Sequence, residues 1–373
     1  MTHAARHLYV HVPFCARRCS YCDFAIAVRR ELPVKQYLDA LSAELALRLP
    51  MGEREVDTIY LGGGTPSLLG AEGVTDLLTL VRQYVKDAPN AELTIEANPE
   101  DVTQNAVQEW QDAGITRVSL GVQSFEPRVL EWMHRVHDAE TSRRAAGIIA
   151  NAGFVSWSLD LIFALPEHLL RDWESDLDQA LELAPPHISA YGLTVEPHTA
   201  LSKWVARGNV SDTPEERYEN EFLAAHNRMA QAGMEHYEVS NYGRPGHASR
   251  HNSAYWTKTP YIGVGPSAHS YDGRERRWNA REYQAWAAQA AAGNDPVAGS
   301  EVLTAEQVYL EDVYLGLRSA IGLAIDQVPP EIVEKWREQG WAHADRSRVR
   351  LTPKGWLRLD ALVAALTAYS NHC

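Results

Sequence analysis

The chain has 373 residues, of which 45% are hydrophobic and 23% charged, and its formal net charge is −14. No apolar run approaches the roughly 18 residues of a membrane-spanning helix, the N-terminus lacks a secretory signal, and the negative charge disfavours nucleic acid as a ligand. We therefore expect a cytoplasmic, globular protein with one large and one smaller domain.

The first 210 residues alternate between short strand patterns and longer helical patterns, which is typical of a parallel sheet covered by helices. The predicted strands are 7–13, 57–62, 91–97, 116–124, 154–166 and 187–194, and the predicted helices are 34–49, 74–85, 103–114, 138–151 and 170–184. Polar and glycine residues occur at or just after the strand ends, at Cys15, Gly62 to Thr65, Glu96, Gln123 and Asp160. A partial β/α barrel and an open doubly wound sheet would both carry a site at these strand ends.

The rest of the chain predicts two further regions. An accessory region at 211–295 begins with a helix at 213–232 and continues through a long segment rich in Gly, Pro, Tyr and His. Long aromatic, loop-like segments of this kind are usually functional or covering. A C-terminal region at 296–373 predicts two helices, followed by a strand, a turn and a third helix within 348–366.

Three of the four cysteines, Cys15, Cys19 and Cys22, have the spacing Cys-x3-Cys-x2-Cys. Thiolates this close in sequence can bind one soft metal centre. Three interpretations are open: a zinc site with His11 or Cys373 as its fourth ligand, a redox pair beside a third thiol, and a [4Fe–4S] cluster with one iron left open. An open coordination position would make the metal centre reactive rather than structural.

The stretch CARRCSYC resembles the CxxxCxxC loop of the radical S-adenosylmethionine (SAM) superfamily, and GGGTPS resembles the superfamily's glycine segment. The resemblance implies that the three cysteines hold a [4Fe–4S] cluster and that the amino and carboxylate groups of SAM bind the open iron. It also implies an electron donor, because an electron from the cluster cleaves SAM to a 5′-deoxyadenosyl radical. The glycines would let backbone N–H groups approach the ligand.

A longer set of motifs resembles the oxygen-independent coproporphyrinogen III oxidase-like family, which includes HemW-type haem chaperones. The motifs are HVPFCxxxCxYCDF, LGGGTPS, TIEANPE, RVSLGVQSF, DLIFALP, HISAYGLTVEPHT, HYEVSNY, HNSAYW and LTPKGW. The resemblance implies a partial (β/α)6 radical SAM barrel over 1–210, an accessory α+β region and a small winged-helix-like C-terminal domain. It also implies one or two SAM molecules, held by Tyr9, Tyr21, Gly63, Gly64, Thr65, Glu96, Gln123, Arg135 and Asp160.

Two features point to one branch of that family. The oxidases have a fourth cysteine where this chain has Phe24, and the replacement is a feature of the HemW branch. That branch also has an HNxxYW motif linked to haem binding, which matches His251, Tyr255 and Trp256. A neutral imidazole is a good axial ligand for haem iron, and His251 is the expected one. The competing candidates are His11, His247 and His269.

The resemblance thus implies a haem chaperone that binds a [4Fe–4S] cluster, SAM and haem as its cargo, and delivers haem to respiratory haem enzymes. The expected partners are haem, those acceptor enzymes and an electron donor, with peripheral membrane association only through partners. The alternative is an oxygen-independent coproporphyrinogen III oxidase, which removes hydrogen from the propionate side chains of its substrate. A zinc-stabilised binding protein is a third hypothesis.

Overall fold

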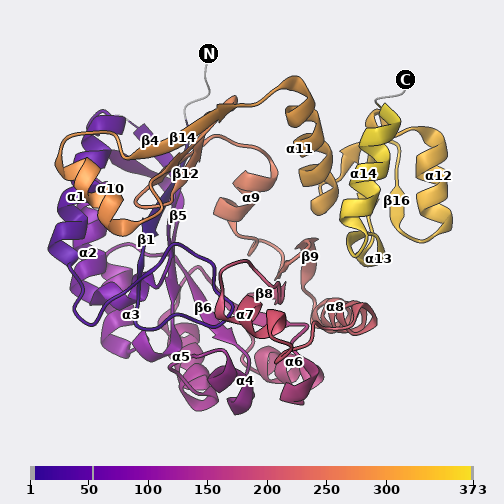
Figure 1. Ribbon diagram of the computed structural model, residues 1–373, viewed down its shortest axis with the longest axis horizontal. Coiled ribbons are helices and arrows are strands. Elements are labelled where there is room, and N and C mark those ends of the chain that lie inside the picture. Colours follow the sequence, from indigo (N-terminus) through magenta and orange to yellow (C-terminus); the bar gives the residue numbers. More distant parts are fainter. Residues whose placement is uncertain (1–4, 53, 371–373) are drawn as a thin grey trace.

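A twelve-stranded mixed sheet lies at the centre of the computed structural model, which describes residues 5–52 and 54–370 (Figure 1). Six of its strands are parallel neighbours that follow the chain order, as the sequence predicts. They are β1 (His7–Val12), β4 (Arg54–Gly63), β5 (Val85–Ala97), β6 (Arg117–Gln123), β7 (Ser156–Phe163) and β8 (His187–Gly192). The two outer strands of this set pair with later strands, β1 with β11 (Tyr261–Val264) and β8 with β10 (Asn241–Gly243). The six strands therefore form a partial barrel.

Helices follow the parallel strands and cover one face of the sheet (Figure 1). The predicted ones are α1 (Val34–Arg48), α2 (Gly70–Val81), α3 (Gln104–Asp112), α5 (Ala139–Ala152) and α6 (Trp173–Glu182). The predicted helix at 74–85 is wrong at its C-terminal end, because Val85 already belongs to β5. Two short helices, α4 (Pro127–Trp132) and α7 (Ala200–Ala206), were not predicted, since they are too short to show a helical period. Within the described ranges, no helix is long and apolar enough to span a bilayer.

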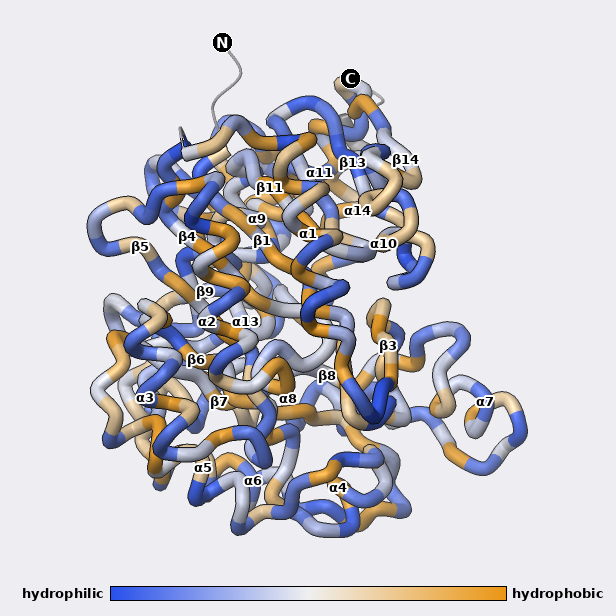
Figure 2. The backbone as a smooth tube through the Cα atoms, turned by 90° about the vertical axis from the view of Figure 1, so that its left-hand side faces the viewer, coloured by the Kyte–Doolittle hydropathy of each residue, from blue (hydrophilic) through white to orange (hydrophobic). Residues whose placement is uncertain are grey.

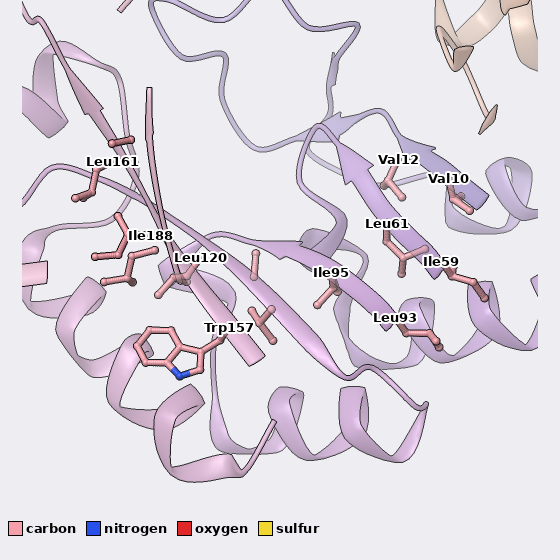
Figure 3. Packing of buried hydrophobic residues seen from close by; sticks show 14 of the residues in the cluster. Val10, Val12, Ile59, Leu61, Leu93, Ile95, Leu120, Trp157, Leu161 and Ile188 are labelled. Atoms are coloured by element: carbon pink, nitrogen blue, oxygen red, sulfur yellow. The ribbon is translucent and has the colours of Figure 1, made fainter. Parts of the chain in front are cut away.

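The two faces of the parallel sheet have opposite polarity, because successive side chains of a strand point to opposite sides. The face toward the helices is buried and apolar, and Figure 3 shows these side chains projecting from the strands: Val10, Val12, Ile59, Leu61, Leu93, Ile95, Leu120, Trp157, Leu161 and Ile188. The opposite face carries three register pairs of polar side chains, Tyr9 with Tyr60, Glu96 with Ser119, and Asp160 with Ser189. The polar surface predicted at the strand ends therefore extends along the strands.

The accessory region extends the sheet on both sides. The predicted helix is confirmed as α8 (Glu215–Gln231), but the expectation of a loop-like segment after it is wrong. Most of the segment forms strands and short helices: β9 (Glu235–Glu238), β10, α9 (Arg250–Trp256), β11, β12 (His269–Tyr271), β13 (Glu275–Asn279) and α10 (Tyr283–Ala291), after which β14 (Val297–Val302) completes the sheet. These strands are short and are separated by Gly and Pro turns, so the sequence shows little sustained alternation.

The C-terminal residues form a small α+β unit that packs beside α8 and after α11 (Ala305–Arg318), in yellow in Figure 1. Its elements are β15 (Leu323–Ala324), α12 (Pro330–Glu338), β16 (Ala342–Ala344), β17 (Arg348–Leu351), α13 (Pro353–Trp356) and α14 (Leu359–Ser370). The buried Trp356 ring lies 4.4 Å from the His236 ring, and its Nε1 donates to the Leu317 carbonyl at 2.9 Å. These contacts fix the unit against β9 and α11. Its likeness to a winged helix remains a prediction.

Glu44 of α1 is a fully buried carboxylate that joins the barrel to the sheet extension. Its Oε1 accepts hydrogen bonds from Asn279 Nδ2 at 2.6 Å and Arg48 Nη1 at 3.1 Å. Its Oε2 accepts from Trp286 Nε1 at 2.8 Å and from the backbone N–H of Gly265 at 2.9 Å. Because both oxygens are fully used, the buried charge is compensated, and it holds α1, α10 and the β11–β12 turn together.

Glu44→Ala should lower the free energy of unfolding by about 3–5 kcal/mol, because it leaves the facing donors buried and unpaired. Urea unfolding followed by circular dichroism measures this change. The matched control is Asp39→Ala on the same helix, which removes only an exposed ion pair with Lys35 and should cost less than about 1 kcal/mol. Equal effects of the two substitutions would contradict the role assigned to Glu44.

Candidate functional site

A cavity of about 360 Å³ lies on the polar face of the parallel sheet, and Cys15, Cys19 and Cys22 all line it. Cys15 ends the short strand β2 (Phe14–Cys15), which pairs with β3 (Ala27–Val28), and the other two lie in the loop between these strands. The three thiols are free. The loop is held at Ser20, whose N–H donates to the Met133 carbonyl at 3.1 Å and whose carbonyl accepts from the N–H of Leu201 at 2.8 Å. Leu201 lies in the first turn of α7, which lies at the edge of the molecule in Figure 2.

Two side chains donate hydrogen bonds to the sulfur atoms. Thr65 Oγ1 lies 3.5 Å from Cys15 Sγ, and Arg135 Nη1 lies 3.5 Å from Cys19 Sγ. Burial raises the pKa of the Cys15 thiol to about 12 and that of the Cys22 thiol to about 11. A metal centre must therefore displace protons from these thiols, after which the two donors would stabilise the thiolates.

The cysteines fit an iron–sulfur cluster by their chemistry and arrangement. Among the described residues, no three His, Cys, Asp or Glu side chains come close enough to share one metal ion. The thiols surround a common cavity instead, as a cluster requires when each of three irons takes one cysteine. Of the other predicted zinc ligands, Cys373 lies outside the described residues, and both ring nitrogens of His11 are hydrogen-bonded, to Tyr9 Oη at 3.1 Å and to the Ala25 carbonyl at 2.9 Å.

The glycines at the end of β4 pack against the start of the cysteine loop. Gly63 has φ +114°, and a Cβ there would lie 2.6 Å from the His11 ring. A Cβ on Gly64 would lie 2.5 Å from the Phe14 carbonyl oxygen. The backbone N–H groups of Gly63, Gly64 and Thr65 donate to Glu96 Oε2, the Val12 carbonyl and the Phe14 carbonyl. In this structure the glycines therefore serve close packing of two protein segments, and the N–H groups expected to face a ligand bond within the protein.

Two half-buried carboxyl groups line the cavity. Glu96 accepts hydrogen bonds from Tyr60 Oη at 2.8 Å and from the N–H of Gly63 at 3.0 Å, yet burial raises its pKa to about 7. Burial also raises the pKa of Asp160, whose Oδ2 accepts from Ser119 Oγ at 2.9 Å. Within the described part of the chain, Asp160 Oδ1 has no hydrogen-bond partner. A ligand with an ammonium group or hydroxyl groups would satisfy these acceptors.

Arg135 is half-buried and connects the cysteine loop to β5 and β6. Besides Cys19, its guanidinium donates to Asn98 Oδ1 at 2.7 Å and to the Gly121 carbonyl at 2.9 Å. Asn98 was not predicted as a site residue, although it follows β5 directly and also donates to Thr65 Oγ1 at 3.4 Å. The sequence does hold a signal for Asn98, because in TIEANPE this asparagine directly follows the strand and precedes a proline.

The structure separates the predicted residues into two places. The predicted SAM residues other than Tyr9 line the cavity: Tyr21, Gly63, Gly64, Thr65, Glu96, Gln123, Arg135 and Asp160. Tyr9 lines a neighbouring groove together with the predicted haem residues Tyr255 and Trp256. His251 lines neither space, because it is buried with Nδ1 2.6 Å from Thr58 Oγ1 and Nε2 2.8 Å from Tyr255 Oη. The binding roles of all these residues remain predictions.

Comparison with known proteins agrees with this geometry. The family model described as the Radical SAM superfamily matches residues 9–180, which run from β1 into α6. Among solved structures, the coproporphyrinogen III oxidase HemN of Escherichia coli, described as a radical SAM enzyme, matches with a TM-score of 0.82 at 24% sequence identity. The match covers 99% of this chain and 92% of that chain, and it concerns the fold. A partial barrel with three cysteines at its cavity is thus the framework of a radical SAM protein, a class that uses a [4Fe–4S] cluster and SAM.

Curated relatives identify the family more closely. A protein of Synechocystis sp. named heme chaperone HemW is 41% identical to this chain, over 86% of this chain and 80% of the relative. A HemW of Mycobacterium tuberculosis is 39% identical, over 96% of this chain and 94% of the relative. The HemW of Bacillus subtilis is 33% identical, over 94% and 96%. The chain therefore belongs to the HemW family.

Gly64→Ala should lose most of its iron after anaerobic reconstitution with iron and sulfide, because the added methyl group displaces the Phe14 carbonyl and with it the cysteine loop. The same crowding should cost about 1–3 kcal/mol of stability. Iron and sulfide analysis with absorption spectroscopy measures the first effect. The control is Gly147→Ala in α5, where a Cβ meets nothing within 4 Å, so iron content should match wild type. Full iron content in Gly64→Ala would contradict the packing role.

Glu96→Gln should stabilise the protein without cofactors by about 3 kcal/mol at pH 8, because a carboxyl group with a pKa raised from 4.5 to about 7 resists ionisation when folded. A raised acid pKa makes the folded state bind protons more tightly, so wild-type stability falls as pH rises from 4.5 to 7. At pH 5 the two proteins should differ by less than about 1 kcal/mol. Urea unfolding at both pH values measures this, and a pH-independent difference would contradict the assignment.

Proposed function

We propose that this protein is a haem chaperone that holds a [4Fe–4S] cluster at Cys15, Cys19 and Cys22, binds SAM in the adjoining cavity, and carries haem to respiratory haem proteins. Three relatives that cover at least four-fifths of this chain are named heme chaperones. The radical SAM superfamily, whose model matches residues 9–180, uses a [4Fe–4S] cluster and SAM.

The observation that carries the proposal is the position of Phe24. Its side chain is 59% exposed, and it lines both the cysteine cavity and the neighbouring aromatic groove. The oxidases that this chain resembles have a cysteine at this position, whereas a phenyl ring can neither bind iron nor contact a second cofactor as sulfur can. It offers an apolar surface to a flat ligand instead. This favours a carrier of a planar tetrapyrrole over an enzyme that oxidises one.

The residues of the cavity suit the class's cofactors. When bound, a reduced cluster can supply an electron to a sulfonium compound. Cys15, Cys19 and Cys22 would hold the cluster, while Thr65 and Arg135 donate hydrogen bonds to its sulfur ligands. The carboxyl groups of Glu96 and Asp160 line the cavity and would orient a cationic, hydroxyl-bearing ligand, since among the described residues Asp160 Oδ1 has no hydrogen-bond partner. These contacts would hold SAM whether or not it is cleaved.

The partners follow from that chemistry. A cluster that changes redox state needs an electron donor, and a haem carrier needs an acceptor enzyme. We propose that any membrane association is peripheral and occurs through these partners.

One alternative has an observation of its own. The fold matches the oxidase HemN with a TM-score of 0.82, so oxidation of coproporphyrinogen III needs a direct test. Anaerobic incubation of the reconstituted protein with coproporphyrinogen III, SAM and a reductant should give no protoporphyrinogen. Sustained conversion of coproporphyrinogen III to protoporphyrinogen would show that the protein is the oxidase and would contradict the chaperone proposal.

Cys19→Ser should lose the cluster and with it haem transfer, because a serine oxygen is a poor substitute for a soft thiolate. Iron analysis and electron spin resonance measure the cluster, and transfer of haem to an apo-form of a haem enzyme measures the function. Cys373→Ser is the matched control and should retain the cluster. If the wild-type protein instead holds tightly bound zinc, and both Cys19→Ser and Cys373→Ser lose it, the protein is a zinc-stabilised binding protein.

A further inference from the structure

A groove of about 1,070 Å³ lies beside the cysteine cavity and has aromatic walls. Its lining includes Phe24, Tyr255, Trp256, Tyr261, Tyr271 and Trp278. Four residues, Asp23, Phe24, Gly63 and Glu96, line both the groove and the cavity, so the two spaces adjoin. The volume matches the upper end of small-molecule sites, roughly 300–1,000 Å³, and flat aromatic walls suit a large planar ligand.

The strand register places His269 among these aromatic side chains. His269 and Tyr271 of β12 are two residues apart and so share a face of the sheet. Directly opposite them on β13 lie Trp278 and Arg276. The Trp278 ring stacks on His269 with centroids 6.0 Å apart. Gly299 of β14 makes room for Trp278, because a Cβ there would lie 2.6 Å from the indole ring.

His269 differs from the other candidate haem ligands in its accessibility. His251 and His11 are buried, and both ring nitrogens of each are already hydrogen-bonded. His247 has Nδ1 3.1 Å from Ser156 Oγ, beside β7. His269 is exposed and lines the groove, and among the described residues neither of its ring nitrogens has a hydrogen-bond partner. It is therefore the candidate whose imidazole can reach an iron in the groove without breaking internal bonds.

Three cationic side chains line the groove, and one of them is available to an anion. Arg276 pairs with Glu311 at 2.6 Å, and Lys258 pairs with Asp312 at 2.8 Å. Arg281 is exposed and donates to the Asp23 carbonyl in the cysteine loop, and no carboxylate of the described chain pairs with it. Glu301 also lines the groove and would repel a carboxylate. Arg281 is therefore the group that would attract a carboxylate-bearing ligand to the groove.

We propose that this groove is the haem site, that His269 is the axial ligand of the haem iron, and that Arg281 pairs with a propionate. The inference rests on the proposed function, because it assumes that haem is the cargo. It departs from the sequence-based expectation that His251 is the ligand. The site would also bring haem next to the cavity that holds the cysteines, through the shared residue Phe24.

The test is titration of ferric haem into the reconstituted protein, followed by absorption and magnetic circular dichroism. His269→Gly should lose the spectrum of imidazole-ligated haem and bind haem at least tenfold more weakly, and free imidazole should restore the spectrum. His251→Gln keeps a hydrogen-bonding side chain between Thr58 and Tyr255 and should retain the spectrum. His247→Gly is the matched control and should behave as wild type. Arg281→Ala should weaken haem severalfold but leave haem dimethyl ester unaffected, since the ester has no carboxylate.

The outcomes separate this inference from the proposed function. If wild type binds haem and His269→Gly keeps the imidazole spectrum, the groove assignment is wrong while the chaperone proposal stands. Loss of the spectrum in His251→Gln alone would identify His251 as the ligand and overturn the inference. If wild type binds no haem, both the inference and the proposed function fail. Retained absorption of the iron–sulfur cluster in each variant shows that the substitution has not unfolded the protein.

Discussion

The close contact between the end of β4 and the start of the cysteine loop fixes the position of everything else in the site. Gly63 and Gly64 leave no space for a side chain between β4 and the residues His11 and Phe14. The backbone hydrogen bonds from Gly64 to Val12 and from Thr65 to Phe14 then set the register of the two segments. Cys15 follows directly, with Thr65 as a donor to its sulfur. The position of the first thiol is therefore a consequence of backbone packing.

The same six strands build both the core and the cavity. Their apolar side chains pack against the helices (Figure 3). The alternate residues form a polar surface that ends in the cavity. A shift of one residue in any strand would exchange these two sets, so burial of the core also fixes the alignment of Glu96, Ser119 and Asp160. The half-buried carboxyl groups of Glu96 and Asp160 oppose this stability, because their raised pKa values reflect the cost of holding charges partly away from water.

The sequence pattern predicted the parallel strands and their helices, and the family resemblance predicted the partial barrel. The three closely spaced cysteines do line one cavity. The parallel strands alternate with helices long enough to show a period, and the cysteine spacing is specific. The sheet extension could not be predicted, because strands as short as β12 show too few alternations. Its aromatic face depends on pairing between β12 and β13, which sequence alone does not reveal. Tyr60 and Asn98 were missed because a tyrosine within a strand and an asparagine after one are usually structural.

The adjoining cavity and groove suggest how one small protein combines a redox centre with a carrier. Phe24 and Glu96 face both spaces, so occupancy of one changes the surroundings of the other.

The central claim is that protein ligands hold only three irons of the cluster and leave the fourth to SAM. Electron–nuclear double resonance on the reduced, reconstituted protein, with SAM labelled by ¹⁵N at its amino group, tests it most directly. The account predicts a hyperfine coupling from that nitrogen to the cluster, and a spectrum in which the label changes nothing would contradict it.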